Sequence, residues 1–171
     1  MASTDSIHFR CMQAMQAVAQ ALAALGSFPV PGGNGTLTIA AAQCYLQMVP
    51  DQKSITLPCL DVTVDGLQEE EGDGNFEEAE VIYPVNALIL DRNSDDYQTP
   101  LPNYLAWRRR WMKALRDWPA GIAPAVLATL PEVAMVEVRG NLVIDPQLPK
   151  YQWVVSGFTA RFTTFEARQK V

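Results

Sequence analysis

Residues 80–89 read EVIYPVNALI, and apolar side chains recur there at every second position. Successive side chains of a strand point to opposite faces, so this alternation predicts a strand with one buried face. The residues on the expected core side are Val81, Tyr83, Val85, Ala87 and Ile89. Pro84 has no backbone N–H to donate, so we expect an edge position or a bulge at that point.

A strand with the same period precedes this stretch. In residues 60–64, LDVTV, the apolar positions face the core, and Asp61 and Thr63 are expected on the opposite, exposed side. The connection between the two strands is too short for a helical crossover. The pattern therefore predicts a long antiparallel hairpin over about residues 55–90. A second hairpin is expected from the alternation in residues 134–139 and 154–163.

Two stretches show helical spacing. The first begins near Ser6, and its apolar residues recur at intervals of three and four: Ile7, Cys11, Met15, Val18, Leu22 and Leu25. Gly26 fits the position after the last helical turn. The second is expected to be capped by Asn103, with Tyr104, Trp107, Trp111, Leu115 and Trp118 on its core face.

These elements predict one α+β domain over residues 1–171. We expect a roughly four-stranded, mainly antiparallel sheet with two main helices on one face, and a long hairpin with an acidic tip. Thr36–Met48 remains open between strand and helix, and Ile122–Leu130 between a short helix and a loop. No apolar run approaches the roughly 20 residues that span a bilayer, and residues 1–10 lack signal-peptide features, so we expect a cytosolic protein.

The charge is concentrated in two blocks. The formal net charge is −6. The acidic block, within residues 69–80, consists of Glu69, Glu70, Glu71, Asp73, Glu77, Glu78 and Glu80. The cationic block consists of Arg108, Arg109, Arg110, Lys113 and Arg116. Both blocks are candidate interfaces, because complementary charges steer and orient association.

The sequence offers no constellation typical of catalysis. His8 is the single histidine, and no nucleophile, acid or metal ligand is patterned around it. Cys11, Cys44 and Cys59 form no CxxC pair, which favours buried free thiols over a zinc or redox site. We therefore expect no enzymatic activity, no cofactor and no bound metal. The acidic block is interpreted as a solvated or partner-facing loop.

Arg108–Arg110 beside Trp111 leaves a second interpretation open, in which the chain is a nucleic-acid-binding accessory protein. Arginines hold phosphates, and aromatic rings stack on bases. However, the spacing of Trp107, Trp111 and Trp118 is that of one buried helix face. The pI of about 4.7 is also far below that of typical nucleic-acid-binding domains.

The order of the elements and their sequence patterns resemble those of the tail-terminator (tail-completion) proteins of long-tailed bacteriophages, over most of the chain. The helix Ser6–Leu25 leads into ITLPCLDV at 55–62, followed by the strand at 80–89. A helix then opens with LPNYL at 101–105, and a strand passes through SGFTARF at 156–162. Neck proteins of the head–tail junction look similar. Thr36–Met48 and Ile122–Leu130 are longer than the minimal pattern.

The resemblance implies a non-enzymatic virion protein that is assembled in the host cytoplasm. Such terminators form a hexameric ring that caps the tail tube, stops its growth and receives the filled head. The implied partners are copies of the chain itself, the tail tube protein and neck or connector proteins. Whether double-stranded DNA passes through the lumen is left open. A ring needs interfaces in which one patch meets a different patch, and the two charge blocks are candidates.

Overall fold

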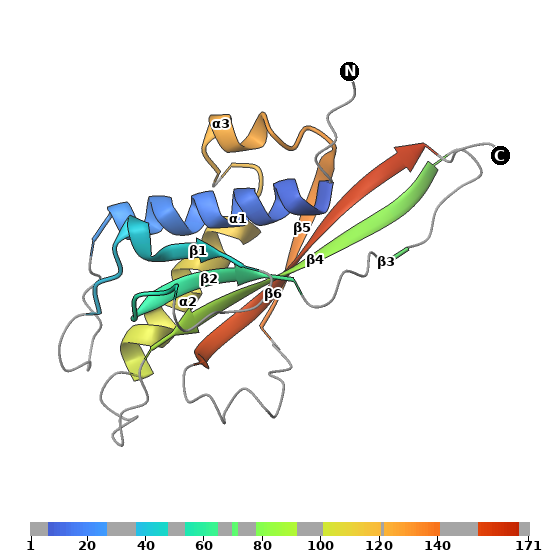
Figure 1. Ribbon diagram of the computed structural model, residues 1–171. Coiled ribbons are helices and arrows are strands. Elements are labelled where there is room, and N and C mark those ends of the chain that lie inside the picture. The colour runs from blue at the N-terminus through green and yellow to red at the C-terminus, as the bar shows by residue number, and fades with distance from the viewer. Residues whose placement is uncertain are drawn as a thin grey trace.

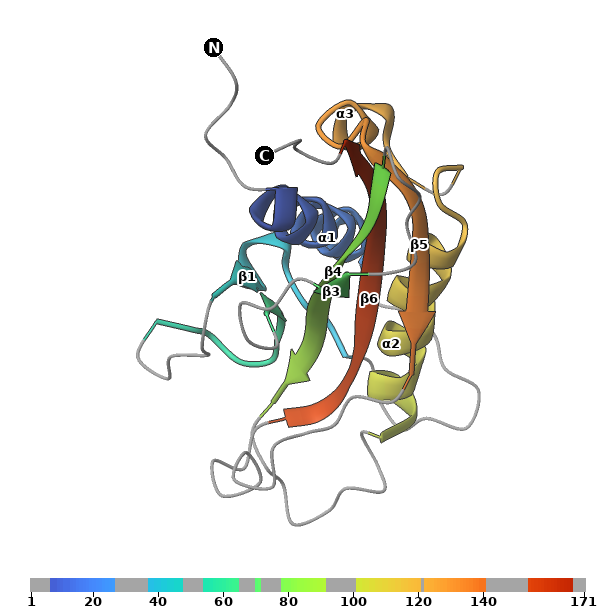
Figure 2. The same cartoon turned by 90° about the vertical axis from the view of Figure 1, so that its right-hand side faces the viewer.

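A computed structural model describes residues 7–26, 37–47, 54–64, 70–71, 78–91, 101–120, 122–140 and 154–167. In this part of the chain the fold is α+β, with a mixed sheet and three helices (Figures 1 and 2). The predicted fold class is confirmed. The helices are α1 (Ile7–Ala24), α2 (Leu101–Arg116) and α3 (Pro124–Leu127), with a 3-10 turn at Ala41–Gln43.

The sheet has the strand order β1-β2-β4-β6-β5, and β3 pairs with β4 beside this path. The strands are β1 (Cys44–Leu46), β2 (Cys59–Thr63), β3 (Glu70–Glu71), β4 (Glu78–Leu90), β5 (Val133–Arg139) and β6 (Val154–Ala167). Only the β1–β2 pair is parallel among these described pairs. The sheet is therefore mainly antiparallel, as predicted, with a strand in the open region Thr36–Met48 in addition to the expected four.

Both predicted hairpins are present as antiparallel pairs. In the first, Cys59 pairs with Leu90 and Thr63 with Asn86. In the second, β5 pairs with β6 along its whole length. Most of the acidic tip between β2 and β4 lies outside the described residues.

The apolar stripe of α1 faces the sheet for most of its length. Cys11, Met15 and Val18 are buried, and Gly26 ends the helix with a positive φ of 82°. The amide of Gly26 donates to the carbonyl of Ala23, as expected for a glycine after the last turn. The prediction was wrong for Leu25, which follows the last residue of α1 and is 71% exposed.

The core face of α2 agrees with its helical spacing. Tyr104, Trp107, Trp111 and Leu115 are buried, and Trp118 is partly buried. The helix begins at Leu101, so the expected capping residue Asn103 lies inside the first turn.

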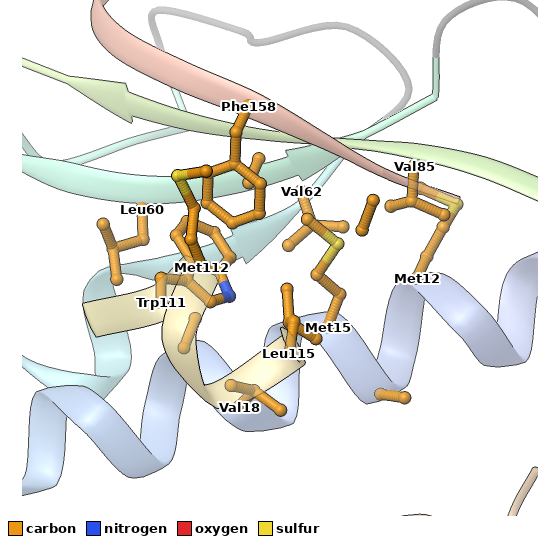
Figure 3. Packing of buried hydrophobic residues seen from close by; sticks show 14 of the residues in the cluster. Met12, Met15, Val18, Leu60, Val62, Val85, Trp111, Met112, Leu115 and Phe158 are labelled. Atoms are coloured by element: carbon orange, nitrogen blue, oxygen red, sulfur yellow. The ribbon is translucent and has the colours of Figure 1, made fainter. Parts of the chain in front are cut away.

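Both long helices cover the same face of the sheet, which makes two layers. Figure 3 shows side chains of α1 and α2 pointing toward those of β2, β4 and β6. Trp111 meets Phe158 edge to face at 5.3 Å, and Trp118 meets Phe162 at 6.0 Å. One continuous apolar core results, which is what two amphipathic helices and one sheet face can bury together.

Pro84 does not lie on an edge strand, because β4 is central in the sheet. The register shift in β4 falls at Ile89/Leu90, so there is no bulge at Pro84 either. Instead, β2 pairs with residues 86–90 of β4, and β3 pairs with residues 81–82 on the same flank. Pro84 therefore occupies the interval between two described partner strands, where a missing donor disrupts neither ladder.

The outer face of β2 is also covered, contrary to the predicted alternation. Asp61 is 0% exposed and Thr63 is 6% exposed. A second apolar cluster on this face contains Cys59, Leu88 and Leu90, with Tyr45, Ile55 and Leu57 packed against it. The alternation showed which side of β2 faces the helices, but Tyr45, Ile55 and Leu57 pack on the other side.

Candidate interface sites

The cationic block follows the outer side of α2. Trp107, Trp111 and Leu115 face the core, so the opposite side of the helix faces solvent. The exposed cations are Arg109, Arg110, Lys113 and Arg116. We call these four residues the cationic face.

Arg108 differs from the other members of its block. It is half-buried, and its guanidinium Nη2 donates to the carbonyl oxygen of Gly140 at the end of β5. A Cβ on Gly140 would lie 2.9 Å from that nitrogen, so a larger residue there would require the Arg108 side chain to shift. Arg108 thus helps to join α2 to the sheet, and the sequence pattern alone could not separate it from Arg109 and Arg110.

The acidic block is described only in part. Glu69, Asp73 and Glu77 lie outside the described residues. Glu70 and Glu71 form β3, which pairs with Ile82 and Val81. Glu78 is exposed and Glu80 half-buried at the beginning of β4.

The first turns of the cationic face lie far from the beginning of β4, whereas its last turn lies nearer, because Trp118 packs on Phe162. The β4–β6 pair extends past the helices in Figure 1 to the end where β4 begins, whereas α2 lies toward the other end. Trp111 packs on Phe158, and Glu78 pairs with Ala167, about nine residues farther along β6. At roughly 3.3 Å per residue, the first turns of the cationic face lie on the order of 30 Å from Glu78.

Two further charge pairs are described, one between distant segments and one within β5. Among the described residues, Arg10 pairs with Glu132 at 3.0 Å and Arg139 with Glu137 at 3.1 Å. The Arg10 guanidinium lowers the pKa of the Glu132 carboxyl, and Arg139 lowers the pKa of Glu137. Both pairs are partly exposed, so each contributes little to stability.

An apolar patch lies on the projecting end of the sheet, on the face away from the helices. Phe165 is 56% exposed and Met135 is 54% exposed. Ile82 pairs with Thr163, which also pairs with Met135, and Glu80 pairs directly with Phe165. We call Ile82, Met135, Phe165 and the flanking Glu78 and Glu80 the ribbon patch. The patch could not be predicted, because the alternation in the sequence was followed only to Thr163, whereas β6 extends to Ala167 and includes Phe165.

A shallow apolar groove lies between the helices. Its lining includes Ala17, Ala21, Leu22, Leu25, Ala114 and Val126, from α1, α2 and α3, around about 260 Å³. Small side chains leave the space, and the exposed Leu25 forms part of the wall. We call this the helix groove. It could not be predicted from the sequence, because three separate segments form it.

His8 has a structural partner. Its Nε2 lies 2.8 Å from the carbonyl oxygen of Pro84, and its ring lies 5.5 Å from that of Tyr83. The predicted buried free thiols are confirmed for Cys11, Cys44 and Cys59. Burial raises their pKa values to about 12, 11 and 12, respectively, so these thiols resist ionisation.

The carboxyl group of Asp61 is buried, and neither of its oxygens has a hydrogen-bond partner among the described residues. Burial raises its pKa to about 7, and the nearby amide of Val62 opposes this shift only in part. Across the strands it pairs with Tyr45 and Leu88, which offer an apolar setting. No group of three or more potential metal ligands occurs among the described residues.

None of the described helices is long and apolar enough to cross a membrane. A scan against models of protein families finds no match for this chain. A comparison with curated protein sequences likewise finds no match.

Proposed function

We propose that this chain is a structural subunit of a phage head–tail junction. In this proposal it is a tail terminator that forms a ring, expected to be a hexamer, on the tail tube and joins the tube to the neck. It acts in the virion through contacts with its own copies, the tail tube protein and neck proteins. Catalysis has no part in this role.

The observation that carries the proposal is the separation of the two charge blocks. The cationic face lies on α2, and the described acidic residues lie in β3 and at the beginning of β4. Surfaces that differ in sign and lie on opposite sides of the sheet, as α2 and Glu80 do, favour heterologous contacts between copies. Repetition of such a contact gives a ring when the rotation closes. Charge would orient these contacts and speed association more than it would tighten them.

The geometry gives less support to the nucleic-acid-binding alternative. Base stacking needs accessible aromatic rings, but Trp107 and Trp111 are 1% and 0% exposed. Arg108 is engaged with Gly140. What remains for phosphate contact is the cationic face on a chain of net charge −6.

Native mass spectrometry and negative-stain imaging of the purified chain test the proposal. We expect closed rings at low salt and at micromolar concentration. The competing function is tested in parallel by titrating labelled double- and single-stranded DNA. A chain that stays monomeric at every concentration, yet binds DNA with a steep salt dependence, would overturn the structural proposal in favour of the accessory protein.

A further inference from the structure

The ribbon patch and the helix groove differ in shape. The ribbon patch presents large side chains, Phe165 and Met135, which are both more than half exposed. The helix groove is a hollow of about 260 Å³ with alanines at Ala17, Ala21 and Ala114. This volume is below the roughly 300–1,000 Å³ typical of sites for small-molecule ligands. A protruding aromatic side chain is a better match for its size and its apolar lining.

The surroundings of the two surfaces are complementary in charge. Glu78 and Glu80 lie on the same side of the sheet as Phe165. At the margin of the groove, Lys113 adjoins Ala114 in sequence, and Arg110 lies one helical turn before it. Asp117 is an acid at the same margin, so the margin has a net positive charge. The floor of the groove is neutral, because α1 has no charged residue from Cys11 to its end.

The two surfaces of one chain cannot meet each other. Phe165 points away from the helices, because β6 directs Phe158 and Phe162 into the core and odd positions such as Phe165 to the opposite face. The groove lies in the helical layer, on the other side of the sheet. A contact between the two surfaces therefore joins different copies, and it is head-to-tail.

We propose that the ribbon patch of one copy docks in the helix groove of the next, with Phe165 as the central anchor. This inference rests on the proposed function, because it names the surfaces through which the ring would form. Aromatic anchors in apolar pockets dominate many interfaces, and charged residues at the rim set orientation. The acids beside Phe165 would face the margin that Arg110 and Lys113 make positive.

Two variants separate the two halves of the contact. Phe165→Asp removes the anchor, and Ala21→Trp fills the groove at an exposed position of α1. Each should lower the association constant by roughly 30-fold or more, the effect of losing one interface hot spot. Leu105→Asp is the matched control, because Leu105 is 45% exposed but belongs to neither surface. Circular dichroism establishes that each variant is folded.

Mixing the two variants gives the sharpest test. Each variant keeps one intact surface, so an equimolar mixture should form heterodimers and no rings in native mass spectrometry. A disulfide provides a second measurement, since Phe165→Cys and Ala21→Cys on one chain should cross-link neighbours under mild oxidation. The native thiols are buried and should give little background.

The outcomes distinguish the inference from the proposed function. If the wild-type chain forms rings and folded Phe165→Asp forms them equally well, the docking inference is wrong and the ring proposal stands. If the wild-type chain is monomeric under all conditions, the proposed function fails together with the inference. Folded variants that fail to pair when mixed would also overturn the head-to-tail contact.

Discussion

His8 Nε2 lies 2.8 Å from the carbonyl oxygen of Pro84, which joins the first turn of α1 to the middle of the central strand. Pro84 occupies the interval between the pairings of β2 and β3 with β4. A buried carbonyl in such an interval needs a donor from outside the ladder. The histidine provides one, which gives the single histidine of the chain a structural role.

Replacing His8 with alanine should destabilise the fold by about 1–3 kcal/mol. The physical reason is that the buried carbonyl oxygen of Pro84 loses its donor and must remain unsatisfied. The free energy of unfolding in urea measures the loss. Gln13→Ala, at an exposed position of the same helix, is the matched control and should stay within about 0.5 kcal/mol of wild type.

The same variant also tests the expectation that His8 has no catalytic role. Below its unfolding transition, folded His8→Ala should assemble like the wild-type chain. A variant that is folded under the assay conditions and still has a severe functional defect would return an enzyme to consideration.

Truncation of Trp111 should show how much the core between the helices and the sheet contributes to stability. Trp111 is 0% exposed and packs edge to face on Phe158. Trp111→Ala should cost roughly 3–5 kcal/mol, as for other large aromatic truncations in cores. A loss below about 1 kcal/mol in denaturant unfolding would contradict the packing described for α2.

Replacing each of two neighbouring tryptophans with phenylalanine separates packing from hydrogen bonding. Trp107 Nε1 donates to the carbonyl oxygen of Leu37 at 3.0 Å, whereas Trp111 Nε1 is buried without a hydrogen-bond partner. Both changes remove a similar volume, but only Trp107→Phe also leaves a carbonyl without its donor. Trp107→Phe should therefore be less stable than Trp111→Phe by about 1 kcal/mol in urea unfolding. Equal losses would show that the Leu37 bond contributes nothing.

The elements that the sequence predicted well are those with long regular patterns. The alternation in β4 placed Tyr83, Val85, Ala87 and Ile89 in the core, where they lie. β1 could not be assigned, because three residues carry no period and its parallel pairing with β2 depends on a distant segment. Asp61 was expected in solvent, because alternation indicates that one face of a strand is buried. It does not show whether other residues also cover the opposite face.

The candidate interfaces follow the same logic. The exposed side of α2 could be predicted, because helical periodicity places the cations opposite the tryptophans. The engagement of Arg108 with Gly140 could not, since it joins residues on separate elements. The helix groove likewise needs three helices in their places, so only the folded chain reveals it.

Asp61 should make the stability fall between about pH 4 and pH 7. Burial raises its pKa from 3.8 to about 7, so in this window the unfolded chain has released the proton and the folded chain keeps it. Stability then decreases as pH rises, by about 1.4 kcal/mol per pH unit and roughly 4 kcal/mol in all. Urea unfolding at several pH values measures this slope.

Asp61→Asn is the matched variant, since asparagine keeps the shape and cannot ionise. The free energy of unfolding of Asp61→Asn should not fall between pH 4 and pH 7 on account of this residue. The difference in stability, variant minus wild type, should therefore be larger at pH 8 than at pH 4. Parallel profiles for the two proteins would show that the Asp61 carboxyl titrates near its ordinary pKa.

Charge reversal on the cationic face should weaken assembly without unfolding the subunit. Arg109, Arg110 and Lys113 are exposed, so replacing all three with glutamate disturbs no core contact, and Arg108 is kept because it donates to Gly140. Each exposed pair contributes only about 0–1 kcal/mol, so the effect comes from several pairs repeated around a ring. Wild-type assembly should weaken as salt rises, since the screening length falls to about 3 Å at 1 M. Sedimentation velocity at low and high salt measures both effects.

Restoring the complementarity tests whether the acidic block is the partner of the cationic face. Mixing the reversed chain with a chain in which Glu69, Glu70 and Glu71 are replaced by lysine should recover part of the association, since the altered surfaces now attract each other. Ala42→Lys adds positive charge at an exposed position that belongs to neither charge block nor to the helix groove. It should leave assembly intact and is the control. If the triple glutamate variant assembles normally at low salt, charge on α2 has no part in the contact. The apolar docking of Phe165 would then have to account for the association alone.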